Sequence, residues 1–368
     1  MLKMLILLAV SMILAYCSQH GILVVPINDK KKLDIPLIAM IIMLSLVVGL
    51  RTNFNDTTAY IGGFKVAPTF DKFIDRSPGL MDYPFFYGYE SLFRHHISDN
   101  PHLFLLSISF FTNATLICFV RRHSENFAFG MLMYFSIGLY VSTMAAMKQC
   151  LAMAVLSFGL EQLFKKKYFR YYIFVFIAML FHVFAIFFIV LPLFTKKPWT
   201  IMTYLTIAAV IFVLFTFEST ISSFLAVADE AGKEINSSYV FDTESINLFR
   251  LAVFAVPPVL SFIFQELLDE TYNTKTNILM NMSILSFLIM SLGLMSAANL
   301  FGRSAIYFEI GTIVIMPTII KEIFSKESQK IGHILVGACY AAFFAYSVLG
   351  FSSEYKALSF GEFLTTLF

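Results

Sequence analysis

The sequence has few charged residues, because Asp, Glu, Lys and Arg together make up 14% of its 368 positions. A soluble domain usually carries roughly a quarter, so this chain lacks the polar side chains that a water-facing surface needs. Hydrophobic residues make up 58%, and they come in long runs typical of transmembrane helices. The short alternating segments of an outer-membrane barrel are missing. Because a backbone in hydrocarbon must satisfy its own hydrogen bonds, we expect an all-α polytopic membrane protein.

Several motifs of soluble enzymes are also missing. The sequence has no Asp-x-Asp pair to hold a metal for a nucleotide sugar, no glycine-rich phosphate loop and no Gly-x-Ser-x-Gly nucleophile site. The four cysteines lie in apolar runs and lack the close spacing of a zinc or redox pair. These absences argue against a cytosolic nucleotide-dependent enzyme and against simple hydrolases.

The apolar runs predict the positions of the membrane-spanning helices. They lie at 4–25, 36–50, 102–120, 127–143, 145–164, 199–217, 248–266, 278–298, 304–320 and 331–350. A further run, 171–194, is either one long span or two short helices that turn near His182. The residues between these runs contain clusters of Lys and Arg, which lie at Lys30–Lys32, Arg121 and Arg122, Lys165–Lys167 and Arg170, Lys196 and Lys197, and Lys321, Lys326 and Lys330.

The basic clusters favour the hairpin. If 171–194 were one span, the basic loops on its two sides would face opposite sides of the membrane. As a hairpin it puts every basic loop on the cytoplasmic side, as the positive-inside rule expects. We therefore expect about twelve spans with both chain ends outside.

Two outer segments are too long to be simple connections. The first, 51–101, carries apolar residues at helix-face spacing, so it predicts amphipathic helices along the membrane interface. Those residues are Phe85, Phe86, Tyr89, Leu92 and Phe93. The second, 218–247, is acidic. No internal repeat stands out, so we expect residues 1–368 to form a single transmembrane domain.

Ionisable groups near membrane depth are costly and therefore mark candidate sites. Three cations, Arg51, Lys148 and Arg303, are expected at similar depth on the outer side, and they suggest an anionic substrate such as a lipid-linked pyrophosphate. The simpler interpretation is that each cation reaches a lipid headgroup or pairs with an acid.

Three further groups are candidate proton acceptors for a hydroxyl nucleophile. They are Asp56, Glu90 and His182. Each has a structural alternative: a helix cap for Asp56, an interfacial salt bridge for Glu90, and the capping of a helix break for His182. Supporting candidates are Asn55, Tyr60, Gln149, Asn299 and Tyr307. Asn299, Arg303 and Tyr307 are spaced i, i+4, i+8, which predicts one helix face.

Four short segments carry a family resemblance. They are Gly49-Leu50-Arg51 with Asn55-Asp56-Thr57 and Tyr60; Met147-Lys148-Gln149-Cys150-Leu151-Ala152; Lys165–Tyr168 with Ala178, Phe181-His182 and Ala185; and Arg303 with Tyr307-Phe308 and Pro317. In order and spacing they resemble the EpsG family of bacterial polysaccharide polymerases, which are Wzy-like. Lys148 stands where the family usually has Arg, which weakens the case for bidentate phosphate binding there. Phe184 stands where Ser is usual, so a hydroxyl role is lost.

The resemblance implies a fold and a reaction. The fold would be a GT-C-like bundle in the bacterial cytoplasmic membrane, with its active site facing the outside or periplasm. The reaction would transfer a growing glycan from undecaprenyl pyrophosphate to a sugar hydroxyl of the next lipid-linked repeat, with no metal or cofactor. Implied partners are membrane lipids, a flippase and a chain-length regulator, but no nucleic acid. A glycan ligase, a transporter or flippase of lipid-linked glycans, and a membrane O-acyltransferase remain alternatives.

We expect Arg51, Lys148 and Arg303 to bind the pyrophosphate in that reaction. Asp56, Glu90 or His182 would accept the proton of the acceptor hydroxyl, while Tyr60, Tyr83 and Tyr87 would stack on sugars.

Overall fold

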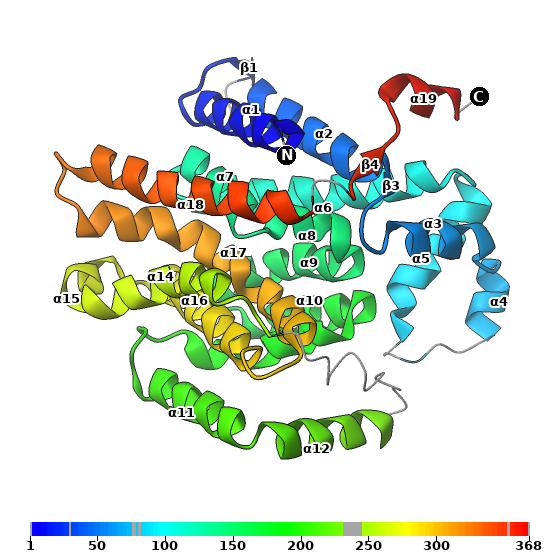
Figure 1. Cartoon of the computed structure of the whole chain (residues 1–368). Helices are drawn as coiled ribbons and strands as arrows, with labels where there is room; N and C mark the ends of the chain where they lie inside the picture. Colours follow the sequence, from blue (N-terminus) through cyan, green and yellow to red (C-terminus); the bar gives the residue numbers. More distant parts are fainter. Residues whose placement is uncertain are drawn as a thin grey trace. The chain divides into compact units, whose positions relative to one another are not determined.

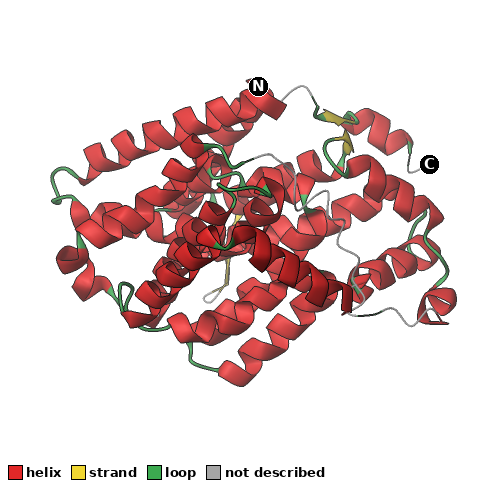
Figure 2. Ribbon diagram, turned by 60° about the horizontal axis from the view of Figure 1, so that its bottom comes forward, coloured by secondary structure: helices red, strands yellow, loops and turns green. Residues whose placement is uncertain are grey.

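The computed structural model describes residues 2–28, 31–75, 79, 82–230, 245–351 and 354–366. Helices dominate the described part of the chain (Figure 2), and its strands form two short antiparallel pairs. The chain divides into two compact units. Unit 1 contains Met1–Glu161, Phe169–Ile186 and Ile334–Phe368, and unit 2 contains Gln162–Tyr168 and Phe187–His333.

Unit 1 contains the N-terminal helices and the C-terminal segment. Its elements are α1 (Leu2–Gln19), β1 (Val24–Asn28), β2 (Lys31–Asp34), α2 (Ile35–Gly49), β3 (Arg51–Asn53), α3 (Thr57–Val66), α4 (Phe70–Asp75), α5 (Pro84–His96), α6 (Pro101–His123), α7 (Phe127–Ser136), α8 (Leu139–Ala145), most of α9 (Met147–Phe164), α10 (Tyr168–Phe181) and α18 (Gln329–Phe351), β4 (Lys356–Ala357) and α19 (Phe360–Thr365).

Unit 2 is built mainly on one long helix pair. Its elements are most of the 3₁₀ helix η2 (Val183–Phe194), α11 (Ile201–Phe215), α12 (Phe217–Glu230), α14 (Leu248–Ile263), α15 (Gln265–Leu268), η3 (Asp269–Thr271), α16 (Thr274–Leu292) and α17 (Ala298–Ile323). The helices α16 and α17 pack along each other, and a Cβ added at Gly311 would lie 2.7 Å from the Leu279 carbonyl oxygen. The small residue therefore permits the close approach of the two backbones.

The helix pair α2 and α6 forms the frame on which the site of unit 1 is built (Figure 1). A Cβ added at Gly49 would lie 2.6 Å from the Leu106 Cα atom, so only glycine lets the two backbones approach this closely. The Ser109 hydroxyl donates to the Ser45 carbonyl (2.9 Å) across the same interface. This contact fixes the position at which the chain leaves α2 and enters β3.

The helix α6 has two chemically different ends. At 23 residues it is about 34 Å long, enough to cross the roughly 30 Å of hydrocarbon in a bilayer. At its C-terminal end Arg121 donates to the Ser18 hydroxyl of α1 (3.0 Å), and Arg122 pairs with Glu161 near the end of α9. At its N-terminal end the Asn100 side chain caps the helix. The basic residues of α6 therefore lie a membrane thickness away from the loops around β3.

Among the described residues, five helices are long and apolar enough to cross a membrane: α1, α6, α16, α17 and α18. Two bent pairs, α7 with α8 (49°) and α14 with α15 and η3 (84°), raise the number to seven. Four shorter apolar helices accompany them: α2, α10, η2 and α11. The structure thus confirms an all-α membrane protein, while the count of about twelve spans stays a prediction.

Two predicted runs end or bend differently in the structure, and one predicted break is present. The first ends at Gln19 and is followed by the β1–β2 hairpin. The run 127–143 is broken at Gly138, whose φ of 91° interrupts the helix. The predicted break at His182 is present, because α10 ends at Phe181 and η2 begins at Val183. Whether the chain turns back there stays a prediction.

The two predicted outer segments contain helices. Residues 51–101 hold α3, α4 and α5, and the acidic segment begins with α12. Residues 231–244 of that segment lie outside the described residues, as do residues 76–78, 80 and 81 of the first one and Lys30 of the first basic cluster.

Candidate active site

Arg51 lies where α2 passes into β3, and β3 pairs with β4 through Arg51 and Ala357. Its side chain is fully buried. Nε donates to the Thr57 hydroxyl (3.0 Å), Nη1 donates to the Val48 carbonyl, and Nη2 contacts the Met147 sulfur (3.6 Å). Burial lowers the pKa of Arg51 to about 10, so the guanidinium is still charged at neutral pH. Arg51 thus connects the end of α2 with the starts of α3 and α9. Its binding to a pyrophosphate stays a prediction.

The turn after β3 brings a carboxylate to the start of α3. Asn55 adopts the left-handed region with a φ of 45°, which asparagine tolerates better than most residues. Asp56 follows at the N-cap position, but its side chain makes no capping hydrogen bond. Its carboxylate instead lines a pocket with Lys148. The geometry therefore does not support the alternative that Asp56 is present mainly as a cap.

An aromatic cluster holds α3, α5 and α6 together. The rings of Phe64 and Phe104 stack with centroids 4.7 Å apart, and Phe86 and Phe93 of α5 pack against the same buried cluster. The predicted amphipathic helix is therefore present, and part of its apolar face packs against protein. This packing fixes the face of α5 that carries Tyr87 and Glu90.

Lys148, at the start of α9, lies among four aromatic rings, which we call the Lys148 cage. Its ammonium donates to the Tyr87 hydroxyl (2.7 Å) and lies 4.3 Å from the centroid of the same ring. Tyr83, Phe86 and Tyr60 follow at 4.9, 5.1 and 5.9 Å. Aromatic faces attract a cation electrostatically, so the rings hold the ammonium in place while leaving it charged.

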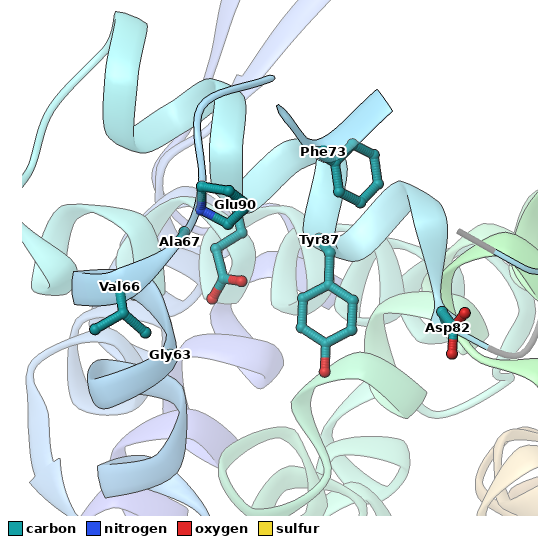
Figure 3. Close-up of a pocket in the computed structure, with 8 residues that line it drawn as sticks. Gly63, Val66, Ala67, Phe73, Asp82, Tyr87 and Glu90 are labelled. Carbon is teal, nitrogen blue, oxygen red and sulfur yellow. The ribbon is translucent and has the colours of Figure 1, made fainter. Parts of the chain in front are cut away.

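Two adjoining pockets open beside this cage. The first, which we call the Lys148 pocket, has a volume of about 230 Å³ and is lined by Asp56, Ala59, Tyr60, Gly63, Phe86, Tyr87, Glu90 and Lys148. The second, the Phe73 pocket (Figure 3), has a volume of about 380 Å³ and is lined by Gly63, Val66, Ala67, Pro68, Phe73, Asp82, Tyr87 and Glu90. Gly63, Tyr87 and Glu90 belong to both pockets.

Glu90 is the carboxyl group common to the two pockets. It is 5% exposed, and burial raises its pKa to about 7, although the charges of Lys148 and Arg94 act in the opposite direction. A Cβ added at Gly63 would lie 3.7 Å from Glu90 Oε1, so α3 passes close to this carboxyl. A group whose pKa lies near the working pH suits general acid–base catalysis.

His182 lies next to the Lys148 cage. Its ring stacks on Tyr83 with centroids 5.2 Å apart and planes 10° apart, and Phe184 meets it edge-on at 5.5 Å. Its backbone amide donates to the Ala178 carbonyl (2.9 Å), the last bond of α10. Tyr83 thus links the predicted histidine to the predicted lysine.

The remaining predicted residues lie in α9 and α17. Gln149 is buried beside Lys148. Asn299, Arg303 and Tyr307 all lie in α17, which confirms that they share one helix face. Asn299 and Arg303 are exposed, whereas Tyr307 is buried and packs near Phe188 (6.3 Å between centroids). These three belong to unit 2, so their part in the site stays a prediction.

Several residues of the two pockets were not predicted from the sequence, among them Gly63, Phe73 and Asp82. Phe73 belongs to α4, and it can lie on α5 because a Cβ at Gly88 would be only 3.2 Å from its Cε1 atom. Nothing in the spacing of these residues predicted that α3, α4 and α5 would enclose one space. The only available signal was that all of them fall in the long segment 51–101.

The described chain is thus a multi-pass α-helical membrane protein with a polar, aromatic-lined site at one end of its helices. The sequence profile of the EpsG family matches residues 34–360, nearly the whole chain. The chain therefore belongs to the EpsG family, which is a family of Wzy-like polysaccharide polymerases, and the resemblance noted from its motifs is confirmed. Neither the curated proteins nor the solved structures contained a match.

Proposed function

We propose that the protein joins repeat oligosaccharides carried on undecaprenyl pyrophosphate, and that the Lys148 pocket is its active site. The observation that carries the proposal is the arrangement of Glu90 and Lys148. A buried carboxyl with a pKa of about 7 shares a pocket with a caged cation and a second carboxylate, Asp56. Together with membership of a polymerase family, this supports transfer of a glycan from an anionic leaving group.

The position of the pocket supports an active site on the outer face. Lys148 lies in the first turn of α9, whereas Glu161, the partner of Arg122, lies 13 residues further on in the same helix, or about 20 Å along its axis. The positive-inside rule assigns the end with Arg121 and Arg122 to the cytoplasm. The opposite end, with the pocket, would then face the outside or periplasm.

In the proposed reaction one C–O bond replaces another. The bond between the anomeric carbon of the growing glycan and the pyrophosphate oxygen breaks, and a bond from that carbon to the acceptor hydroxyl forms. The hydroxyl proton passes to the Glu90 carboxylate, and undecaprenyl pyrophosphate leaves with the bonding electron pair. Lys148 stabilises the charge that develops on the leaving group, which a fixed cation does without reorganising. No metal or cofactor takes part.

The neighbouring residues would support this step. Asp56 would place a second carboxyl group in the same pocket, and Asn55 would fix the turn that presents it. His182 would orient Tyr83, and Tyr60 and Tyr87 would stack on sugar rings. Arg51, which is buried and contacts Thr57 and Met147, would hold β3 against the start of α9 and add its charge to the pyrophosphate site.

The residues of α17 complete the proposal. Arg303 would bind the pyrophosphate, with Asn299 and Tyr307 on the same helix face as supporting groups, and Gln149, which follows Lys148 in the chain, would be a further supporting group. The chain would form a GT-C-like bundle of about twelve spans in the cytoplasmic membrane, receive its substrate from a flippase and work with a chain-length regulator.

The test is in vitro polymerisation. Purified full-length protein in lipid nanodiscs is mixed with a lipid-pyrophosphate repeat unit, without nucleotide sugar and with EDTA. The proposal expects a ladder of products with added repeats and release of the lipid pyrophosphate in equal amount. A ligase would attach the glycan to a different acceptor, and a flippase would leave the repeat unit unchanged. Either result would overturn the proposal.

A further inference from the structure

The two adjoining pockets differ in charge. The Lys148 pocket is lined by the carboxyl groups of Asp56 and Glu90 and also by a cation, Lys148, which could bind an anion. Among the described residues that line the Phe73 pocket, two carry carboxyl groups, Asp82 and Glu90, and none carries a positive charge. A pyrophosphate would find no positive charge among these residues to offset its repulsion by the carboxylates.

The lining of the Phe73 pocket suits a neutral ring with hydroxyl groups. Phe73 and Tyr87 offer aromatic faces, and Val66, Ala67 and Pro68 complete an apolar wall. The carboxylates can accept hydrogen bonds from hydroxyl groups. Figure 3 shows the ring of Tyr87 and the carboxylate of Glu90 lying side by side, with Asp82 on the far side of Tyr87. Such a pocket, mostly apolar with a few oriented polar groups, is typical of a small-molecule site.

We propose that the Phe73 pocket binds a neutral sugar ring of the acceptor, while the Lys148 pocket binds the pyrophosphate of the donor. The inference rests on the proposed function. It assigns the acceptor side to α4 and α5 and makes Phe73 and Asp82 specificity-determining residues. Since Glu90 belongs to both pockets, it lies where an acceptor hydroxyl meets the anomeric carbon of the donor. Glu90 rather than Asp56 is then the proton acceptor.

Three features shape the acceptor side. Gly88 lets Phe73 lie directly on α5. Asp82 is exposed beside the pocket, and its Oδ2 accepts a hydrogen bond from the Gly79 amide (3.0 Å), which orients the carboxylate. Gly63 leaves the space beside Glu90 unfilled, since a Cβ there would come within 3.7 Å of Oε1.

The test measures the binding of two probes to full-length protein in nanodiscs by isothermal titration calorimetry. One probe is inorganic pyrophosphate. The other is the methyl glycoside of the repeat oligosaccharide, cut from the host's own polymer and free of phosphate. We expect Phe73→Leu to weaken glycoside binding about fivefold, as the loss of an aromatic contact does, and to leave pyrophosphate binding unchanged. Asp82→Asn should also weaken glycoside binding and leave pyrophosphate binding unchanged. Lys148→Met should weaken pyrophosphate binding and leave glycoside binding unchanged.

Matched controls are available on nearby surfaces. Asp71→Asn changes an exposed carboxylate on α4, and Phe169→Leu changes a ring of α10 that is 81% exposed. Neither is expected to alter the binding of either probe. The inference is overturned if wild-type protein does not bind the glycoside, or if Phe73→Leu and Asp82→Asn leave its affinity unchanged. Failure of the proposed function would appear differently, as a missing product ladder with glycoside binding intact.

Discussion

The raised pKa of Glu90 leads to a sharp prediction about how the rate of glycan transfer depends on pH. A proton acceptor works only when it is ionised. With a pKa of about 7, about one tenth of the Glu90 carboxyls are ionised at pH 6 and about nine tenths at pH 8. A glutamate with its ordinary pKa would be almost fully ionised over that range. The rate should therefore rise about tenfold from pH 6 to pH 8 and then level off.

The position of this rise can be shifted without touching the pocket chemistry. The charge of Arg94 lowers the pKa of Glu90, so Arg94→Met should move the midpoint of the profile to higher pH. The assay is single-turnover release of lipid pyrophosphate by the purified protein, measured at half-unit steps of pH. A rate that stays flat between pH 5 and pH 8, or a midpoint that moves down in Arg94→Met, would refute the reasoning.

The same group makes an independent prediction about stability. The pKa of Glu90 is higher in the folded than in the unfolded chain, so the folded protein binds the extra proton and its stability falls as pH rises from about 4.5 to about 7. Above pH 7 the ionised carboxyl costs about 3 kcal/mol. Glu90→Gln should therefore raise the melting temperature at pH 8 and leave it unchanged at pH 4.5, while it abolishes transfer. If Glu90→Gln and wild type had the same melting temperature at pH 8 as well as at pH 4.5, the Glu90 carboxyl would not be desolvated.

Three further substitutions, one of them with a matched control, test the contacts around the site. Gly49→Ala places a Cβ 2.6 Å from the Leu106 Cα and should destabilise the protein by about 1–3 kcal/mol, whereas Gly62→Ala, with nothing within 4 Å, should be neutral or stabilising in thermal unfolding. Arg51→Lys loses the forked contacts of the guanidinium and should lower the melting temperature; a raised KM for the donor at normal melting temperature would instead indicate direct pyrophosphate binding. Tyr355→Phe removes the hydrogen bond to the Val47 carbonyl (2.7 Å) and should cost about 1 kcal/mol in the same assay, and an unchanged melting temperature would show that β4 does not depend on it.

The sequence predicted the helices better than their ends. A long apolar run indicates that a segment is removed from water, but it does not predict where the chain turns within that segment. The bend at Gly138 needed a φ of 91°, which the sequence permits but does not demand. The β1–β2 hairpin was missed because Val24 and Val25 continue the apolar run of α1 in composition while favouring a strand in shape.

The site was predicted as a set of chemical groups rather than as a geometry. Lys148, Glu90 and Asp56 could be chosen because ionisable groups near a membrane are costly. That they share a pocket depends on the packing of α3 and α5 on α6, which no spacing in the sequence specifies. The burial of Arg51 was also not foreseen, because a cation at the end of an apolar run is equally consistent with an exposed position.

The most direct test of the central claim, that the pocket around Glu90 and Lys148 is where polymerisation occurs, is the polymer made in a deletion strain. Polymer length is measured in cells carrying wild-type protein, Glu90→Gln or the control Asp71→Asn at equal protein levels in the membrane. We expect full-length polymer with wild type and Asp71→Asn, and only single lipid-linked repeats with Glu90→Gln. Full-length polymer from Glu90→Gln would contradict the claim.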